Sequence, residues 1–552
     1  MLQPSPLGPI PDDTARVAQA AFPAGHPYLM LADALGTLFT DELFASLFPS
    51  AGQPALAPWR LALVSILQFA EGLSDRQAAH AVRSRIDWKY VLRLELTDAG
   101  FDASVLSEFR ARLRSGEAEQ ILLETLLGWC RERGLLKTRG RQRTDSTHIL
   151  AAVRALNRIE VVTETMRHAL DCLAVAAPAW LATWVPAEWT ERYARRAEEG
   201  RMPAGKNARA DLAQTIGGDG YALFAALDTP GTPSWLRELP ALETLRRVWI
   251  QNFYVEADKL QWRTDELGIP PAVRFLSSPY DPDAHLGKKG STCWVGYKVA
   301  LTETCEEDRP NLITHVMTTA APIADGTMTP QVHADLQERN LLPAVHVVDT
   351  GFLDAALLVT SKRDYSVDLL GPARPDVKWQ ARQGKGFDVQ HFVIDWEREH
   401  ATCPEGHTSV QWTPAVDNRA TQVIKIRFST KDCQACPSLP DCVRSQTPYP
   451  RRLITIRPKE SYEALQERRA REQTAAYAQE YAKRAGIEGT LSQGVRRCRL
   501  RRSRYIGLSR VHLGHLLTAT ALNFVRLGEW LARTPRAQTR HSAFVRLMAP
   551  AG

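Results

Sequence analysis

The spacing of apolar positions predicts helices through the first quarter of the chain. In residues 57–72, APWRLALVSILQFAEG, apolar side chains recur three and four positions apart, which is the period of one face of an α-helix. Ser74 and Gln77 then form a capping-box pattern that opens a second helix. Two more helices are expected before the next change of pattern. Residues 1–138 are therefore predicted to be an all-helical domain.

From residue 277 the pattern changes to alternating strands and helices. Residues 292–304 and 311–319 are rich in β-branched and aromatic side chains and are close enough to pair as a hairpin. A helix, an apolar strand ending at Asp349, another helix and a short strand follow, which is the order of a mixed α/β sheet. Open α/β sheets bind ligands at the carboxyl ends of their strands, so Asp349 is a candidate functional residue.

The stretch 141–150, RQRTDSTHIL, would place Asp145 on a strand. Its upstream half is too polar to predict a buried strand, and a turn aspartate that caps the following helix is the alternative. From Leu156 the apolar spacing is helical again, and helices with loops are expected to about residue 270. Residues 151–275 are therefore predicted to form a large helical insertion.

Residues 375–450 are predicted to be rich in strands and contain a group of cysteines. These are Cys403, Cys433, Cys436 and Cys442. Four thiolates can close a tetrahedral structural zinc site, and the two-residue gap between Cys433 and Cys436 lets both sulfur atoms reach one ion. Reduced thiols without a metal are the alternative, and His407 is a possible substitute ligand.

A lone carboxylate, Glu488, precedes a strongly basic run with six arginines in residues 496–504. At helical spacing Tyr481, Arg484 and Glu488 lie at i, i+3 and i+7, so one helix would present all three on one face. Glycines at 486, 489 and 494 weaken such a helix, which then needs close backbone packing. A solvated basic helix with an incidental glutamate is the alternative.

Composition limits the class of protein. The chain has 552 residues, 44% of them hydrophobic, and a net charge of +7, which fits about three or four globular domains. The positive charge is clustered at 139–143, 192–209 and 496–510, as in proteins that bind phosphate backbones. No apolar run reaches the roughly 18–20 residues of a membrane span, and nine cysteines do not resemble a secreted disulfide framework, so we expect a cytoplasmic protein.

The three candidate carboxylates, Asp145, Asp349 and Glu488, are far apart in sequence, so only the fold can bring them together. Three such charges repel one another unless they hold hard divalent cations, and oxygen ligands suit magnesium or manganese. Two ions about 3.5–4 Å apart would activate a water or a 3′-hydroxyl and stabilise the leaving oxygen of a phosphodiester. The hypothesis is metal-dependent phosphodiester cleavage and transfer, with the basic run holding DNA phosphates.

Several ordered motifs carry a family resemblance. They are TDSTHIL (144–150), WVGYKVALTET (294–304), VVDTGFLDA (347–355), CPEGH (403–407), YAKRAGIEGTLSQG (481–494) and RYIGLSRVHLGHLLTATALNFVRL (504–527). Together they resemble a bacterial insertion-sequence transposase of the DDE type, and residues 57–113 are similar to the helical N-terminal domain of InsH-like transposases. The resemblance covers most of the chain.

The resemblance implies a ribonuclease-H-like mixed-sheet core in which Asp145, Asp349 and Glu488 bind two Mg²⁺ or Mn²⁺ ions. Tyr481 and Arg484 match the tyrosine and arginine that accompany the glutamate. The sequence departs from the family pattern in two places: Val495 stands where a lysine is expected, and Phe352 where a tyrosine is common. The first departure leaves open which cation grips the transposon end.

The expected organisation follows from these patterns and the resemblance. The parts are a helical DNA-binding domain (1–138), the catalytic core in three segments (139–150, 276–374 and 451–535), the helical insertion (151–275), the β-rich cysteine-containing insertion (375–450) and a mobile tail (536–552). The residues expected to contact DNA are Tyr481, Arg484, Arg496, Arg497, Arg499, Arg501, Arg502, Arg504 and Arg76. Helix arginines are more often plain solvated surface, which is the alternative for Arg76.

The resemblance implies a DNA transposase that acts as a homodimer on double-stranded DNA, both transposon ends and target, in the bacterial nucleoid. A domesticated DNA-binding regulator without catalysis is one alternative. A metal-dependent nuclease without strand transfer is the other.

Overall fold

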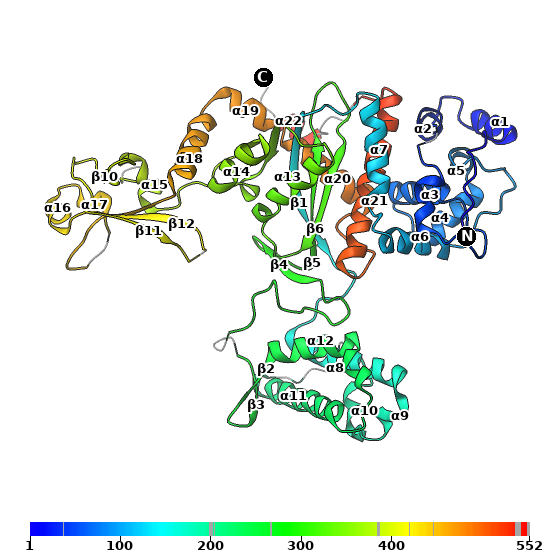
Figure 1. Ribbon diagram of the computed structural model, residues 1–552, viewed down its shortest axis with the longest axis horizontal. Helices are drawn as coiled ribbons and strands as arrows, with labels where there is room; N and C mark the ends of the chain where they lie inside the picture. The colour runs from blue at the N-terminus through cyan, green and yellow to red at the C-terminus, as the bar shows by residue number, and fades with distance from the viewer. Residues whose placement is uncertain are drawn as a thin grey trace. The chain divides into compact units, whose positions relative to one another are not determined.

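The computed structural model describes residues 1–36, 38–197, 203, 205–264, 268–383, 387–418, 420–444, 447–535 and 543–548 (Figure 1). The chain forms two compact units. The first comprises Met1–Lys137, Ser146–Ile323 and Gly489–Gly552, and the second comprises Thr138–Asp145 and Ala324–Glu488. Most of the predicted tail, 536–552, lies outside the described residues, which include only the helix α22 (Ala543–Met548) there.

The N-terminal part of the first unit is helical, as predicted. Its elements are α1 (Asp12–Ala21), α2 (Pro27–Leu35), the 3-10 helix η1 (Glu42–Leu47), α3 (Pro58–Glu71), α4 (Asp75–Ser84), α5 (Ile86–Val91), α6 (Ser104–Ser115) and α7 (Ile121–Glu132). The predicted capping box is confirmed: the Gln77 backbone N–H donates to Ser74 Oγ, and the Ser74 N–H donates to Gln77 Oε1. Gly72 ends α3 in the left-handed conformation that glycine favours.

The long helix α21 (Leu508–Leu531) is the central helix of the first unit. It packs against α3, α2 and α7, and against the strand β6 (Ile313–Ala320). Most of its side chains from Val511 to Gly528 are buried, which fits a helix that is apolar around most of its circumference.

The main sheet is mixed. Its other strands are β1 (Arg141–Leu150), β4 (His285–Lys289), β5 (Thr292–Thr304), β7 (Val345–Val348) and β8 (Asp368–Leu370). In the first unit β5 pairs antiparallel with β4 and with β6, which confirms the predicted hairpin. In the second unit β1 and β7 are parallel, as are β7 and β8. The strand order is β4-β5-β1-β7-β8 with β6 paired to β5, so the expectation of a mixed α/β fold holds.

The polar upstream half of β1 is the clearest departure from the sequence prediction. Gln142, Arg143 and Thr144 are buried within the strand. Gln142 donates to the carbonyl oxygen of Leu341 (2.6 Å), and Arg143 donates to that of Lys483. A polar side chain can be buried when it is hydrogen-bonded, and these partners lie about two hundred or more residues away in sequence, where local pattern cannot reveal them. Asp145 is therefore a strand residue and not a turn cap.

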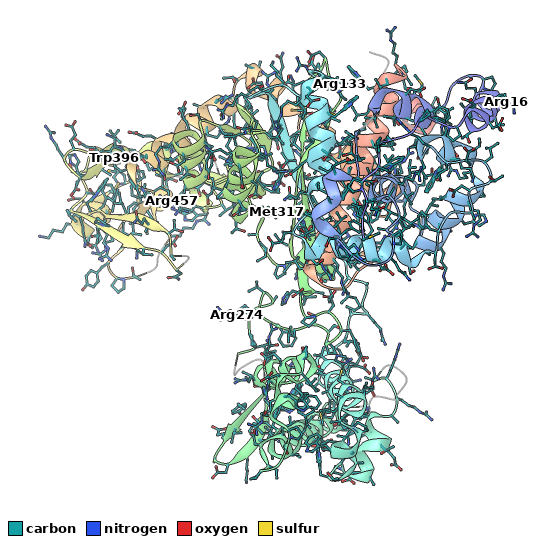
Figure 2. The ribbon with its side chains drawn as sticks, turned by 45° about the vertical axis from the view of Figure 1, so that its right-hand side comes forward. Arg16, Arg133, Arg274, Met317, Trp396 and Arg457 are labelled. Atoms are coloured by element: carbon teal, nitrogen blue, oxygen red, sulfur yellow. The ribbon has the colours of Figure 1, made fainter. Side chains whose placement is uncertain are left out.

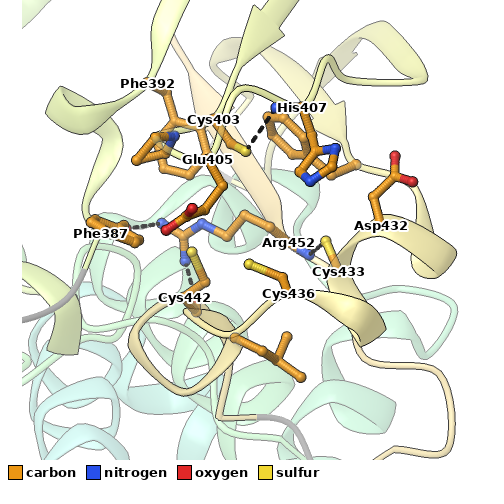
Figure 3. Close-up of a pocket in the computed structure, with 13 residues that line it drawn as sticks. Phe387, Phe392, Cys403, Glu405, His407, Asp432, Cys433, Cys436, Cys442 and Arg452 are labelled. Carbon is orange, nitrogen blue, oxygen red and sulfur yellow. Dashed lines mark hydrogen bonds between the residues drawn. The ribbon is translucent and has the colours of Figure 1, made fainter.

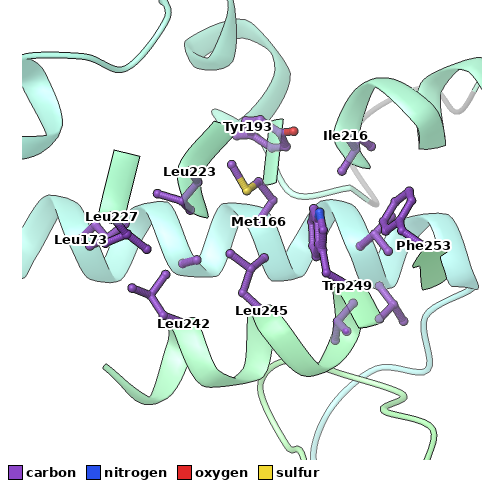
Figure 4. Close-up of a cluster of buried hydrophobic side chains, with 14 of the residues drawn as sticks. Met166, Leu173, Tyr193, Ile216, Leu223, Leu227, Leu242, Leu245, Trp249 and Phe253 are labelled. Atoms are coloured by element: carbon purple, nitrogen blue, oxygen red, sulfur yellow. The ribbon is translucent and has the colours of Figure 1, made fainter. Parts of the chain in front are cut away.

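The predicted helical insertion has a core of its own. It contains α8 (Arg158–Ala176), α9 (Pro178–Ala182), α10 (Ala187–Tyr193), α11 (Lys206–Asp228), η2 (Ser234–Glu238) and α12 (Pro240–Asn252). Figure 4 shows Met166, Leu245 and Trp249 packed between these helices. A short hairpin of β2 (Phe253–Glu256) and β3 (Lys259–Trp262) follows, which the helical pattern did not predict.

The second unit adds helices and the β-rich insertion. Its helices are η4 (Asp325–Thr327), α13 (Thr329–Glu338), η5 (Thr350–Phe352), α14 (Ala355–Tyr365), α18 (Lys459–Glu472), α19 (Ala475–Ala482) and the start of α20 (Ala485–Cys498). The insertion contains α15 (Trp379–Gln383), η6 (Val389–His391), β9 (Val393–Asp395), β10 (His400–Thr402), β11 (Gln411–Val416), β12 (Gln422–Arg427), α16 (Thr430–Ala435), α17 (Leu439–Cys442) and β13 (Leu453–Ile456). Trp396, labelled in Figure 2, packs edge-on against Trp412 there.

One further property concerns membranes. Within the ranges that the structure describes, no helix combines the length and the apolar character needed to cross a bilayer.

Candidate active site

Asp145 and Asp349 project from neighbouring parallel strands of the second unit. Thr144 of β1 lies opposite Val348 of β7. The residues that follow these two are Asp145 and Asp349. Neighbouring strands are about 4.8 Å apart, and residues in register point to the same face of a sheet. The strand pairing therefore brings together two carboxylates that are 204 positions apart in sequence.

The Asp349 side chain has a local structural role as well. Its Oδ1 accepts hydrogen bonds from the backbone N–H groups of Gly351 (2.8 Å) and Phe352 (3.3 Å), and so caps the short helix η5. This cap fixes the carboxylate just beyond the carboxyl end of β7. A carboxylate has a second oxygen that can accept further bonds or bind a cation.

Arg484 joins the third carboxylate to this group. Its guanidinium donates to Asp145 Oδ2 at 3.1 Å and to Glu488 Oε1. The Asp145 side chain is 13% exposed and that of Glu488 is 61% exposed, so the bridge links a nearly buried acid to a solvent-facing one. Burial works to lower the pKa of Arg484, but the neighbouring acidic groups outweigh burial and the pKa is raised.

Tyr481 lies within electrostatic reach of the same group. Burial raises the pKa of Tyr481, Arg484 lowers it, and the carboxylates of Asp349 and Asp145 add to the rise. Its ring stacks on that of Tyr477, with centroids 5.7 Å apart and planes inclined by 10°. The second unit therefore gathers the predicted residues Tyr481, Arg484, Asp145, Asp349 and Glu488 around one region.

The predicted single helix through Tyr481 and Glu488 is wrong. Tyr481 lies in the last turn of α19, which ends at Ala482; a turn follows at Lys483 and Arg484, and Glu488 lies in the first turn of α20. The Arg143 guanidinium donates to the Lys483 carbonyl at this turn and occupies the space that a Cβ of Gly486 would need. A side chain at 486 would have to displace this guanidinium, so Gly486 is closely packed against Arg143, in agreement with the expectation of close packing around a glycine-weakened helix.

The donor chemistry of the three carboxylates suits magnesium or manganese, but their present arrangement is not a closed metal site. In the part of the chain that the structure describes, no three His, Cys, Asp or Glu side chains are grouped closely enough to hold an ion. Arg484 lies between Asp145 and Glu488 and supplies the positive charge that such a cluster requires. A shared ion would need Glu488 to leave Arg484.

The sequence analysis did not predict two features close to these carboxylates. Asp325 of η4 is one: a Cβ at Gly351 would lie 3.0 Å from Asp349 Oδ1 and 3.2 Å from Asp325 Oδ2, which places a fourth carboxylate close by. The ADGT turn gave no sign of this. The other is a buried chain of hydrogen bonds that starts at Thr144, the residue before Asp145: His346 is hydrogen-bonded to Thr144 Oγ1 (2.6 Å) and to His333 Nε2 (2.9 Å).

The predicted DNA-contacting arginines of the first unit fall into two groups. The side chains of Arg76, Arg496, Arg499 and Arg502 are exposed, and no hydrogen bond or ion pair ties them to the described structure. Three others are used within the fold, in bonds to the Ala70 carbonyl (Arg497), the Leu73 carbonyl (Arg504) and the Thr147 hydroxyl (Arg501). Arg504 also stacks over the Phe69 ring at 4.9 Å.

The four cysteines predicted to bind zinc line one cavity in the second unit. Figure 3 shows Cys403, Cys433, Cys436 and Cys442 around this cavity, with His407 and Arg452 beside them. All four are free thiols. Burial raises the pKa of the Cys442 thiol to about 11, and the neighbouring thiols add to the rise.

Two segments of the chain match protein-family models. Residues 16–112 match a model described as a transposase domain (DUF772), and residues 402–528 match one described as a transposase DDE domain. The second segment includes Tyr481, Arg484 and Glu488, whereas Asp145 and Asp349 lie outside both. No curated protein and no solved structure matches the chain. Both matched models are transposase models, and together they support an insertion-sequence transposase.

Proposed function

We propose that this chain is a DNA transposase that binds the terminal inverted repeats of its element, cleaves a strand to free a 3′-hydroxyl, and joins that hydroxyl to target DNA. The observation that carries the proposal is that Arg484 joins Asp145 to Glu488, while the register of β1 and β7 brings Asp349 next to Asp145. The two transposase matches at separate ends of the chain support it independently.

The proposed roles follow from the position of each side chain. Asp145 and Asp349 offer oxygen ligands from a rigid pair of strands, while the exposed Glu488 is free to turn once it leaves Arg484. Two Mg²⁺ or Mn²⁺ ions held there would supply activation of the attacking water or hydroxyl and stabilisation of the leaving oxygen. Arg484, released from Glu488, is then a donor for a DNA phosphate.

The finer architecture belongs to the same proposal. A ribonuclease-H-like core is supported by the mixed sheet, in which parallel and antiparallel pairs adjoin, and by an acid on β1 next to one that follows β7. A homodimer on DNA is proposed because two transposon ends must be joined in one reaction.

Asp349→Asn is the decisive test. Asparagine keeps the oxygen that accepts from Gly351 and Phe352, so η5 stays capped, while the charge that would bind a cation is lost. We expect cleavage of labelled transposon-end DNA to fall by at least ~100-fold, the scale on which loss of one stabilising group lowers an enzymatic rate. Binding of the same DNA, measured by mobility shift, should persist.

Asp354→Asn is the matched control. Asp354 caps α14 in the same unit, its side chain is exposed, and asparagine caps a helix equally well. This variant should cleave normally. Unchanged cleavage by Asp349→Asn would overturn the assignment. Binding without cleavage by the unaltered protein would favour the regulator, and cleavage without joining would favour the nuclease.

A further inference from the structure

The cysteine cavity is lined by side chains from several short segments of the β-rich insertion. Cys403 follows the three-residue strand β10, Cys433 lies in α16, Cys436 follows that helix, and Cys442 ends the four-residue helix α17. Isolated helices this short are unstable in water. The cavity that the four side chains line has a volume of about 30 Å³, which is the scale of a single ion or water molecule.

Backbone donors are aimed at two of the sulfur atoms. The His407 N–H donates to Cys403 Sγ at 3.3 Å, and the Arg452 N–H donates to Cys433 Sγ at 3.4 Å. The first bond belongs to a tight turn in which the Cys403 N–H donates to the His407 carbonyl (2.9 Å) and Gly406 has φ of 82°. Metal-bound sulfur atoms commonly accept such hydrogen bonds from their surroundings, which hold the ligands in place.

The β-rich insertion has only a small apolar core. The residues buried in it are Phe392, Ala401, Ile426, Phe428, Ile454 and Ile456. Small modules with so little buried apolar surface usually need a disulfide, a metal or a partner for stability. All four thiols are reduced, so a disulfide does not supply this stability.

A positive charge stands beside the thiols. The buried Arg452 donates from its guanidinium to the carbonyl oxygens of Cys442 and Phe387, both at 2.9 Å, and its side chain lines the cavity. Four thiolates around one divalent ion leave a net charge of −2, and a buried guanidinium next to them offsets part of it.

We propose that Cys403, Cys433, Cys436 and Cys442 bind one structural Zn²⁺ that holds the β-rich insertion together. A set of four soft sulfur ligands selects zinc over magnesium or calcium. In the described residues the thiols do not yet stand close enough to share an ion, so binding must draw the turn after β10, α16 and α17 inward. The proposal does not depend on the chain being a transposase.

The test measures zinc in the full-length chain purified without a polyhistidine tag. We expect one zinc per chain by elemental analysis, released when a mercurial reagent titrates the thiols. Replacing zinc by Co²⁺ should give the absorption of tetrahedral thiolate coordination. Cys436→Ser and Cys442→Ser should each lose the metal, and protease should then cut within 375–450 while circular dichroism shows the remaining helices intact.

Two matched variants separate ligands from bystanders. Cys293→Ser removes an exposed cysteine of β5, and His407→Ala removes the imidazole at the cavity. Both should keep one zinc per chain. A wild-type chain without zinc, or a chain that keeps its zinc after Cys436 and Cys442 are both replaced, would overturn the proposal. Loss of zinc in His407→Ala would overturn the four-cysteine ligand set.

Discussion

At the scale of single residues, the charge balance of the candidate active site depends on Arg484. It bridges Asp145 and Glu488, and the neighbouring carboxylate of Asp349 follows directly after the next strand, β7. Without a cation these acids would repel one another, and the guanidinium takes the place of that cation. The arginine at i−4 before the glutamate was visible in the sequence, but its bond to Asp145 depends on the fold.

Arg484→Met should make the thermal stability of the protein more dependent on divalent ions. The substitution leaves the acids without their counter-ion while keeping a side chain of similar length. We expect the melting temperature without Mg²⁺ to fall, and added Mg²⁺ to raise it more in the variant than in the unaltered protein, because bound ligand stabilises the folded state. Calorimetry with and without MgCl₂ measures this. An equal response of both proteins to Mg²⁺ would contradict the assigned role.

The buried chain Thr144–His346–His333 predicts a dependence of stability on pH. Burial lowers the pKa of His333 to about 4, whereas an unfolded histidine titrates near ~6.5. Between these values the unfolded chain binds a proton that the folded chain does not. The free energy of unfolding should therefore fall as the pH drops from about 6.5 to about 4, by up to ~1.4 kcal/mol for each pH unit.

Replacing His333 by glutamine tests this dependence. Glutamine is neutral throughout the range and can still bond His346, so denaturant unfolding of the variant should show a shallower loss of stability on acidification. His80→Gln alters an exposed histidine of α4 and serves as the control. If both variants keep the slope of the unaltered protein, His333 does not carry the effect.

At the scale of elements, the sequence predicted those structures that local patterns determine. The capping box at Ser74, the hairpin of β5 and β6 and the strand before Asp349 each depend on residues a few positions apart. The buried polar half of β1 and the break before α20 depend on Leu341 and on Arg143, which are distant in sequence. The proximity of Asp145 and Asp349 likewise follows from strand register.

A buried ion pair fixes α20 from Gly489 onward to the rest of the first unit. Glu303, at the end of β5, has a fully buried side chain and pairs with Arg526 of α21 at 2.8 Å. Thr490 donates to Glu303 (2.6 Å) and accepts from Arg526 (2.6 Å), and Arg526 also donates to Gln493. Two residues of α20 are thereby bound to β5 and α21.

Arg526→Met should be strongly destabilising. It leaves Glu303 buried without its counter-charge, which typically costs ~3–5 kcal/mol. The double variant Glu303→Leu with Arg526→Met removes both charges and should recover part of that loss, because an apolar pair needs no desolvated partner. Chemical denaturation of the four proteins of this cycle measures the coupling. A double variant no more stable than Arg526→Met alone would show that the pair is not the source of the cost.

At the scale of the whole molecule, the candidate carboxylates belong to the second unit and the basic run to the first. The arginines of the run also differ in their contacts. Arg504 and Arg497 donate to backbone carbonyls, whereas the exposed side chains of Arg496, Arg499 and Arg502 make no such bond in the described residues. The net charge of +7 does not distinguish arginines that bind within the fold from arginines that are open to solvent. Arg496, Arg499 and Arg502 can therefore bind DNA phosphates without loss of a bond that the described structure contains.

Replacing Arg496, Arg499 and Arg502 together by glutamine should weaken DNA binding without unfolding the protein. Each phosphate contact contributes about 0.9 to the slope of log K against log salt concentration, so the slope should become shallower by up to ~2.7 and affinity should fall on every DNA sequence alike.

Arg504→Gln should behave in the opposite way, because it removes the donor to the Leu73 carbonyl and the stacking on Phe69. Its melting temperature should drop while its salt slope stays the same. Fluorescence anisotropy at several salt concentrations, with thermal melts of both variants, distinguishes a phosphate-binding group from a structural one, and an unchanged slope in the triple variant would assign DNA binding to another surface.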